Sequence, residues 1–112
     1  MRCVDTTQLL KGVLDLAVLA VLRDEDGYGY DILRRLRAAG LQDVGDASVY
    51  GTLRRLFANG FLNAYVVPSD EGPHRKYYAL NAAGRAELER NGKTWHGFAV
   101  IMDDLLRDRG TA

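Results

Sequence analysis

The sequence predicts a mainly α-helical fold with one small β-hairpin, arranged as a winged helix-turn-helix that is followed by a long C-terminal helix. Three observations predict it. Residues 46–60 have helical periodicity between an acidic start and a glycine. Residues 61–80 have the composition of two strands around a turn. Residues 81–109 return to helical spacing, with large apolar residues at nearly heptad intervals. We expect residues 1–80 to form the winged domain and residues 81–112 to form the C-terminal helix and tail.

The length of the chain and its single cysteine limit the kinds of protein to which it can belong. With 112 residues it can bury one small core. Cys3 alone cannot form a disulfide framework or a thiolate metal cluster within one chain. The apolar stretch Val13–Leu22 contains Asp15 and is too short to span a bilayer, and Met1–Thr7 lacks the pattern of a signal peptide. We therefore expect a chain of the reducing cytoplasm with no membrane segment.

The first two predicted helices form the start of the winged domain. One begins after a cap at Thr6 or Thr7, ends near Arg23 and is apolar on almost every side, so it needs cover from several neighbours. The next runs from about Tyr28 to Ala39 and ends at Gly40. Its predicted buried stripe is Gly29, Ile32, Leu33 and Leu36, and its predicted solvent-facing arginines are Arg34, Arg35 and Arg37.

The third predicted helix has one apolar and one cationic face. We expect Asp46 to cap its start and Gly60 to end it in the left-handed conformation. A helical projection places Val49, Leu53, Leu56 and Phe57 on the core side, and Ser48, Gly51, Arg54 and Arg55 on the other. Small residues and guanidinium groups suit a surface that lies against a polyanion. The alternative is an ordinary amphipathic helix with solvated arginines.

The hairpin that follows carries cations at the start of its second strand. Residues 61–67 and 74–80 are rich in aromatic and β-branched types, and residues 68–73 form a turn cluster. The second strand opens with His74, Arg75 and Lys76, and we expect one of Tyr77 and Tyr78 to be buried and the other half-exposed. A helix followed by such a hairpin is the order of a winged helix, whose wing contacts the phosphate backbone.

Charge is distributed in a way that fits this interpretation. The formal net charge of the chain is zero, so the overall charge gives no indication of a nucleic-acid partner. Residues 48–80, however, contain four arginine or lysine residues and only two acidic residues, both in the predicted turn. A neutral chain with a cationic edge fits a repressor that must leave non-specific DNA readily.

Four runs, in order and at suitable spacing, resemble the PadR family of bacterial winged-helix transcriptional regulators, in its shorter subgroup. They are LLKGVLD, GYGYDIL, SVYGTLRRLFANGFL and GPHRKYYALNAAG. Two residues depart from the family: Phe57 falls where many members carry an acid, and Asn81 falls where threonine usually starts the last helix. Asparagine caps as well as threonine. The resemblance implies DNA contacts by Ser48, Tyr50, Thr52, Arg54, Arg55, His74, Arg75 and Lys76.

The last predicted helix carries an apolar row that the small core has no room to cover. Its members are Leu88, Trp95, Phe98, Met102 and Leu105. This row predicts a homodimer, and hence a pseudo-palindromic site on double-stranded DNA with half-sites about one helical turn apart. In some multidrug-sensing members of the resembled family, aromatic residues here stack on flat ligands. Trp95 and Phe98 are therefore either ligand-binding residues or simple dimer packing.

We expect a dimeric, sequence-specific repressor that a small aromatic or hydrophobic molecule releases from DNA. The sequence offers no catalytic constellation or phosphate loop, so we expect neither an enzyme nor a cofactor. A metal-responsive regulator is one alternative, although Cys3, His74 and His96 lack ligand spacing and we expect no metal site. A winged helix that binds protein rather than DNA is the other alternative.

Overall fold

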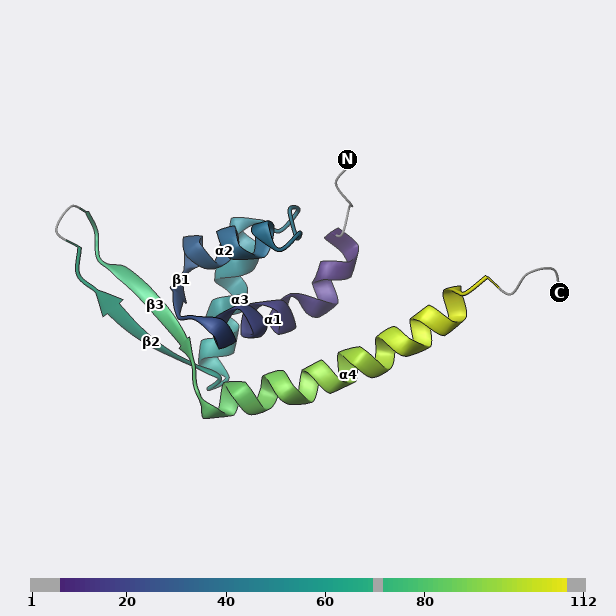
Figure 1. Cartoon of the computed structure of the whole chain (residues 1–112). Coiled ribbons are helices and arrows are strands. Elements are labelled where there is room, and N and C mark those ends of the chain that lie inside the picture. Colours follow the sequence, from purple (N-terminus) through teal and green to yellow (C-terminus); the bar gives the residue numbers. More distant parts are fainter. Residues whose placement is uncertain (1–6, 70–71, 109–112) are drawn as a thin grey trace.

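The computed structural model describes residues 7–69 and 72–108, which form four helices and three short strands. The helices are α1 (Thr7–Asp24), α2 (Gly29–Ala38), α3 (Asp46–Ala58) and α4 (Ala82–Leu106). The strands are β1 (Gly27–Tyr28), β2 (Leu62–Val67) and β3 (Arg75–Leu80). Helices α1 to α3 form a compact body with the sheet on one side, and α4 runs away from the sheet beneath α1 (Figure 1). The predicted winged helix with a long last helix is confirmed.

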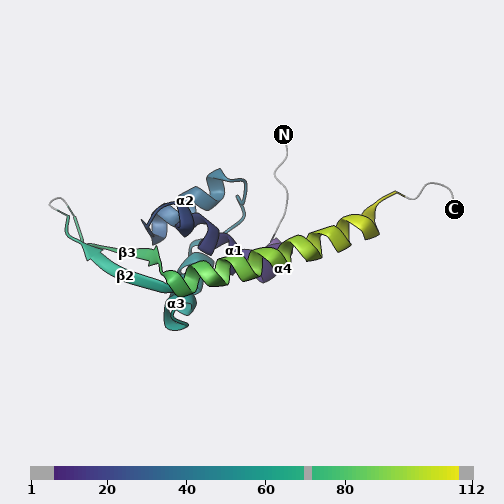
Figure 2. The same cartoon turned by 60° about the horizontal axis from the view of Figure 1, so that its bottom comes forward.

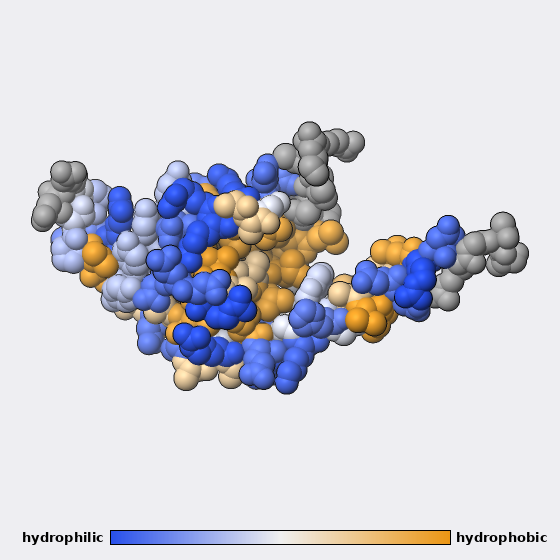
Figure 3. All heavy atoms as spheres, viewed as in Figure 1, coloured by the Kyte–Doolittle hydropathy of each residue, from blue (hydrophilic) through white to orange (hydrophobic). Residues whose placement is uncertain are grey.

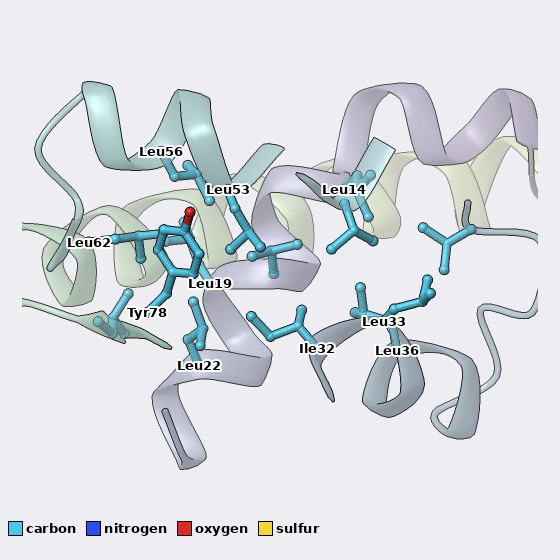
Figure 4. Close-up of a cluster of buried hydrophobic side chains, with 14 of the residues drawn as sticks. Leu14, Leu19, Leu22, Ile32, Leu33, Leu36, Leu53, Leu56, Leu62 and Tyr78 are labelled. Atoms are coloured by element: carbon cyan, nitrogen blue, oxygen red, sulfur yellow. The ribbon is translucent and has the colours of Figure 1, made fainter. Parts of the chain in front are cut away.

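A single hydrophobic core joins α1, α2, α3 and the two long strands. Leu19 and Leu22 of α1 belong to the same cluster of buried side chains as Ile32 of α2 and Leu53 of α3 (Figure 4). Each of these four side chains is at most 2% exposed. Burial of one such side chain stabilises the fold by roughly 1.5–3 kcal/mol. The core therefore fixes the orientation of α3, because one side of that helix is held by contacts from α1 and α2.

Helix α1 is covered on several sides, as its apolar composition predicts. It packs against α2, α3, α4 and β3. The predicted cap at Thr6 and the side chain of Thr7 lie outside the residues that the structure describes.

One of the three arginines of α2 differs from the prediction. Arg34 is exposed and pairs with Asp31 at 2.8 Å. Arg37 instead donates to the carbonyl oxygen of Val44 at 2.9 Å, which closes the loop before α3. Arg35 donates to backbone carbonyl oxygens of Val21, Glu25 and Asp26. Arg37 nevertheless stays exposed, as predicted. The expectation of a solvent-facing side chain is wrong for Arg35 alone, which is half-buried and binds carbonyl oxygens at the end of α1 and in the loop that follows it.

The ends of α3 confirm one prediction and correct another. Gly60 has a φ of 85°, the left-handed conformation expected of a residue that ends a helix. Asp46, however, is the first helical residue, and Gly45 occupies the cap position without a side-chain hydrogen bond. The carboxylate of Asp46 therefore contributes through its charge near the positive end of the helix rather than as a cap.

The wing is a three-stranded antiparallel sheet rather than a hairpin alone. Its order is β1-β3-β2, and Tyr77 of β3 pairs with Tyr28 on one side and Tyr65 on the other. β1 was missed because a two-residue strand carries no periodic pattern. Tyr78 is buried and Tyr77 is half-buried, which confirms the predicted alternation.

Helix α4 begins with the predicted cap. The side-chain oxygen of Asn81 accepts a hydrogen bond from the backbone N–H of Gly84 at 2.8 Å. Leu88 packs partly against the core. Beyond it the helix extends away from the body, and its far end lies opposite the wing (Figures 1 and 2).

Candidate nucleic-acid interface

The face of α3 that points away from the core is exposed and carries polar and small residues. Ser48, Tyr50, Arg54 and Arg55 are exposed, whereas Val49, Leu53 and Leu56 are buried. Thr52 is only 3% exposed. It lies three residues after Val49 and four before Leu56, so the helical repeat places it in the buried stripe. We therefore leave Thr52 out of the surface that can meet DNA.

Phe57 is the one predicted core residue of α3 that the structure places at the surface. Its side chain is 45% exposed. One edge of its ring meets Tyr78 of β3, with ring centroids 6.5 Å apart. The amino group of Lys76 lies 5.3 Å from the ring centroid, within the range of a cation–π contact. The prediction failed because Phe57 lies at the edge of the stripe, beside the wing rather than under it.

The two arginines of α3 differ in their surroundings. Nη2 of Arg55 lies 2.5 Å from Oδ1 of Asp15 on α1, and this hydrogen bond and charge raise the pKa of Arg55. Arg54 forms no ion pair or hydrogen bond with any residue that the structure describes. Arg54 is therefore free to bind an incoming anion, whereas Arg55 already has a partner.

Tyr50 lies over the start of α2. A β-carbon built on Gly29 would lie 2.0 Å from Cε1 of the Tyr50 ring, so the ring occupies the space that the glycine leaves. Tyr50 is nevertheless 41% exposed. Its ring is thus fixed against the body while part of it remains at the surface beside Arg54.

We expect Gly29→Ala to displace the Tyr50 ring and to lower the free energy of unfolding by about 1–3 kcal/mol. The added methyl group would lie 2.0 Å from Cε1 of Tyr50, so the ring must move away from the start of α2. Duplex affinity should fall about as much as in Tyr50→Ala. Chemical denaturation and fluorescence anisotropy on both variants check this, and a Gly29→Ala variant with wild-type affinity would contradict it.

The cations of the wing point to opposite faces of β3. The guanidinium carbon of Arg75 lies 4.7 Å from the centroid of the Tyr28 ring, and Lys76 lies beside Phe57 and Tyr78. His74 is exposed just before the strand. Within the described residues neither Arg75 nor Lys76 pairs with a carboxylate. Their charges therefore remain available to phosphate.

Aromatic contacts join the three strands of the wing to one another. Tyr77 stacks on Tyr65 with centroids 5.6 Å apart, and it meets the edge of Tyr28 at 5.3 Å. The hydroxyl of Tyr65 donates to Asp26 at 2.6 Å, and this hydrogen bond raises the pKa of Tyr65. The rings therefore hold the strands of the wing together, and the Tyr65–Asp26 hydrogen bond ties β2 to the loop that follows α1.

Helix α4 carries a row of apolar residues, which we call the α4 row: Leu88, Trp95, Phe98, Met102 and Leu105. Leu88 and Met102 are half-buried, and the other three are exposed. Trp95 is 41% exposed, Phe98 54% and Leu105 67%. The rings of Trp95 and Phe98 lie 6.2 Å apart. Figure 3 shows apolar residues along the far half of α4 and on the face of the body beside it. One chain alone leaves this surface uncovered.

An open hollow of about 380 Å³ lies beside the first half of α4, and neither Trp95 nor Phe98 lines it. Ligand binding at these two residues stays a prediction.

Among residues 7–69 and 72–108, no three histidine, cysteine or acidic side chains are grouped so that they could hold a metal ion. Within the same residues, no helix has the length and apolar character that a membrane crossing requires.

Comparison with known proteins decides the family. Residues 18–90 match the model of the transcriptional regulator PadR-like family, which is more than half of the chain. The chain belongs to the PadR-like family. Members of this family are transcriptional regulators and not enzymes, so the resemblance drawn from the sequence is confirmed.

Solved structures agree with this assignment. A PadR-like transcriptional regulator from Bacillus cereus is 30% identical, with a TM-score of 0.80 over 91% of this chain and 99% of that chain. A PadR family regulator from Eggerthella lenta is 28% identical, with a TM-score of 0.83 over 93% and 90%. A probable transcriptional regulator of Mycobacterium tuberculosis is 34% identical over 66% of this chain, which spans 40% of that relative's length.

Proposed function

We propose that this PadR-like regulator binds double-stranded DNA sequence-specifically, with α3 reading the major groove and the wing holding the phosphate backbone. The observation that carries the proposal is that Arg54 and the wing cations lie on adjacent exposed elements without acidic partners among the described residues. Guanidinium groups bind phosphate or the acceptor edge of guanine. The proposed contact residues are Ser48, Tyr50, Arg54, Arg55, His74, Arg75 and Lys76.

We propose that the active form is a homodimer joined through α4. A second copy would cover the α4 row, whose exposed aromatic residues are the types that most often anchor interfaces. Two-fold symmetry would then present two α3 helices to one duplex. The site in DNA would be a pseudo-palindrome with half-sites about one helical turn, or roughly 34–36 Å, apart.

Selection of bound duplexes from a random pool tests both parts of this proposal. Purified protein is mixed with random double-stranded DNA, and bound molecules are amplified and sequenced. A recovered inverted repeat supports specific binding and the two-fold dimer together. Recovery of no shared sequence, with binding no better than to random DNA, would contradict the proposal.

We further propose that the regulator is a repressor of the bacterial cytoplasm that releases DNA when a flat aromatic or hydrophobic molecule binds near Trp95 and Phe98. Their rings lie 6.2 Å apart on an exposed face. A ligand there would shift the dimer only if it binds one spacing of the two α3 helices more tightly than another. Helix α1 packs against both α3 and α4 and so offers a physical connection between the two regions.

Trp95→Ala should weaken the dimer or abolish the response to flat aromatic molecules. Loss of a central tryptophan anchor costs an interface about 2 kcal/mol or more, a rise in the dimer dissociation constant of about 30-fold. Sedimentation equilibrium measures this loss. Because Trp95 is the only tryptophan of the chain, its fluorescence also reports ligand binding in the wild type.

Val100→Ala is the matched control for Trp95→Ala. Val100 is 67% exposed on the same helix and lies about 140° around the axis from Trp95. This variant should keep wild-type dimer mass and ligand response. If Trp95→Ala is equally unaffected in both measurements, the proposed roles of Trp95 are refuted.

A further inference from the structure

An ion pair joins the proposed reading helix to α1. Oδ1 of Asp15 accepts a hydrogen bond from Nη2 of Arg55 at 2.5 Å, across 40 positions of sequence. The same nitrogen lies 3.4 Å from the hydroxyl oxygen of buried Thr52. Both hydrogen bonds are therefore donated by the same nitrogen of the guanidinium group. Its Nε and Nη1 atoms have no hydrogen-bond partner among the described residues.

This arrangement orients Arg55 without consuming its capacity to bind. A guanidinium group has five N–H donors in one plane, and the Nε and Nη1 donors of Arg55 can each form a single hydrogen bond to a phosphate oxygen or a base acceptor. A free arginine loses side-chain freedom when it binds, and a group that is already held loses less. The side chain of Arg55 is still 54% exposed, so it remains accessible at the surface of α3.

We infer that Asp15 is a positioning residue that holds Arg55 for sequence-specific contact with DNA; the inference rests on the proposed DNA binding. Asp15 could instead act only as a negative charge that repels phosphate. Simple repulsion acts on every duplex alike, and its removal strengthens binding. Positioning acts on the contact that Arg55 makes, so its loss weakens the selected duplex relative to others. Positioning is favoured because Asp15 and Thr52 both bind one nitrogen of Arg55 and leave its other donors unused.

The test compares Asp15→Ala with Asp24→Ala in the full-length chain. Asp24 is also an acid of α1 paired with an arginine, Arg23, at 3.2 Å, so both variants lose the same charge. Anisotropy measures affinity for the selected duplex and for a scrambled one. Asp15→Ala should lower the ratio of the two affinities about tenfold, the size expected for loss of one hydrogen bond to a charged group. Asp24→Ala should leave that ratio unchanged.

A double-variant cycle separates positioning from a general effect. In a chain that already carries Arg55→Ala, Asp15→Ala should cause no further loss of selectivity. In the otherwise wild-type chain, Asp15→Glu should keep more selectivity than Asp15→Ala, because it retains a carboxylate. Asp15→Asn provides a second variant if Asp15→Ala proves unstable by circular dichroism. Equal behaviour of Asp15→Ala and Asp24→Ala would overturn the inference alone. A wild-type chain that binds no duplex selectively would overturn the proposed function as well.

Discussion

Replacement of Arg54 by alanine is expected to weaken binding to the selected duplex by about 1–3 kcal/mol, or roughly 5- to 150-fold in Kd. Arg54 is exposed in the middle of the free face of α3 and has no acidic partner within the described chain. Its guanidinium group therefore arrives at DNA without first breaking an internal ion pair. Fluorescence anisotropy on labelled duplexes measures the effect.

A scrambled duplex distinguishes the two roles open to Arg54. If Arg54 reads a base edge, its loss weakens the selected duplex alone; if it holds phosphate, all duplexes weaken alike. Arg90→Ala is the matched control, because it removes the same charge from an exposed arginine of α4 that pairs with Glu87. Equal affinities of Arg54→Ala and Arg90→Ala for the selected duplex would remove Arg54 from the proposed contact set.

Replacement of Gly84 by alanine is expected to cost about 3 kcal/mol of unfolding free energy. A β-carbon at Gly84 would lie 2.2 Å from the carbonyl oxygen of Phe61 and 2.6 Å from Cδ1 of Leu80. The Phe61 contact is with backbone, so no side-chain rotation relieves it. This clash would separate the start of α4 from the base of the wing. Urea denaturation followed by circular dichroism checks the loss.

Gly97→Ala is the control for this prediction. Gly97 lies in the same helix, and a β-carbon there meets nothing within 4 Å. Alanine favours a helix over glycine by up to about 1 kcal/mol, so this variant should be as stable as the wild type or slightly more stable. A Gly84→Ala variant that matches Gly97→Ala in its urea midpoint would show that α4 does not pack closely against the wing.

Local patterns were enough to predict the elements that carry the proposed function. The apolar repeat through Val49, Leu53 and Leu56 predicted α3, and the strand composition around the turn predicted the wing. Asn81 and Gly60 predicted where helices begin and end, because both act through neighbouring backbone. The far half of α4 likewise follows from spacing alone.

Contacts between residues distant in sequence could not be predicted in this way. The pair Arg55–Asp15 depends on how α1 crosses α3, and the contacts of Arg35 with carbonyls of residues 21–26 depend on how α2 follows α1. Phe57 was misplaced because the helical repeat does not say how far β3 extends over α3. Such features belong to packing, which one sequence does not encode in a local repeat.

In the proposed complex, each subunit of the dimer binds the duplex through the cationic surface of its α3 and wing. The most direct test of this arrangement is the salt dependence of wild-type binding to the selected duplex. Two subunits together present eight cationic side chains, from Arg54, Arg55, Arg75 and Lys76. If between half and all of these reach phosphate, the dimer makes four to eight phosphate contacts. The plot of log K against log salt should then be linear with a slope of about −4 to −7. Binding that is absent at low salt, or that does not change with salt, would contradict the account.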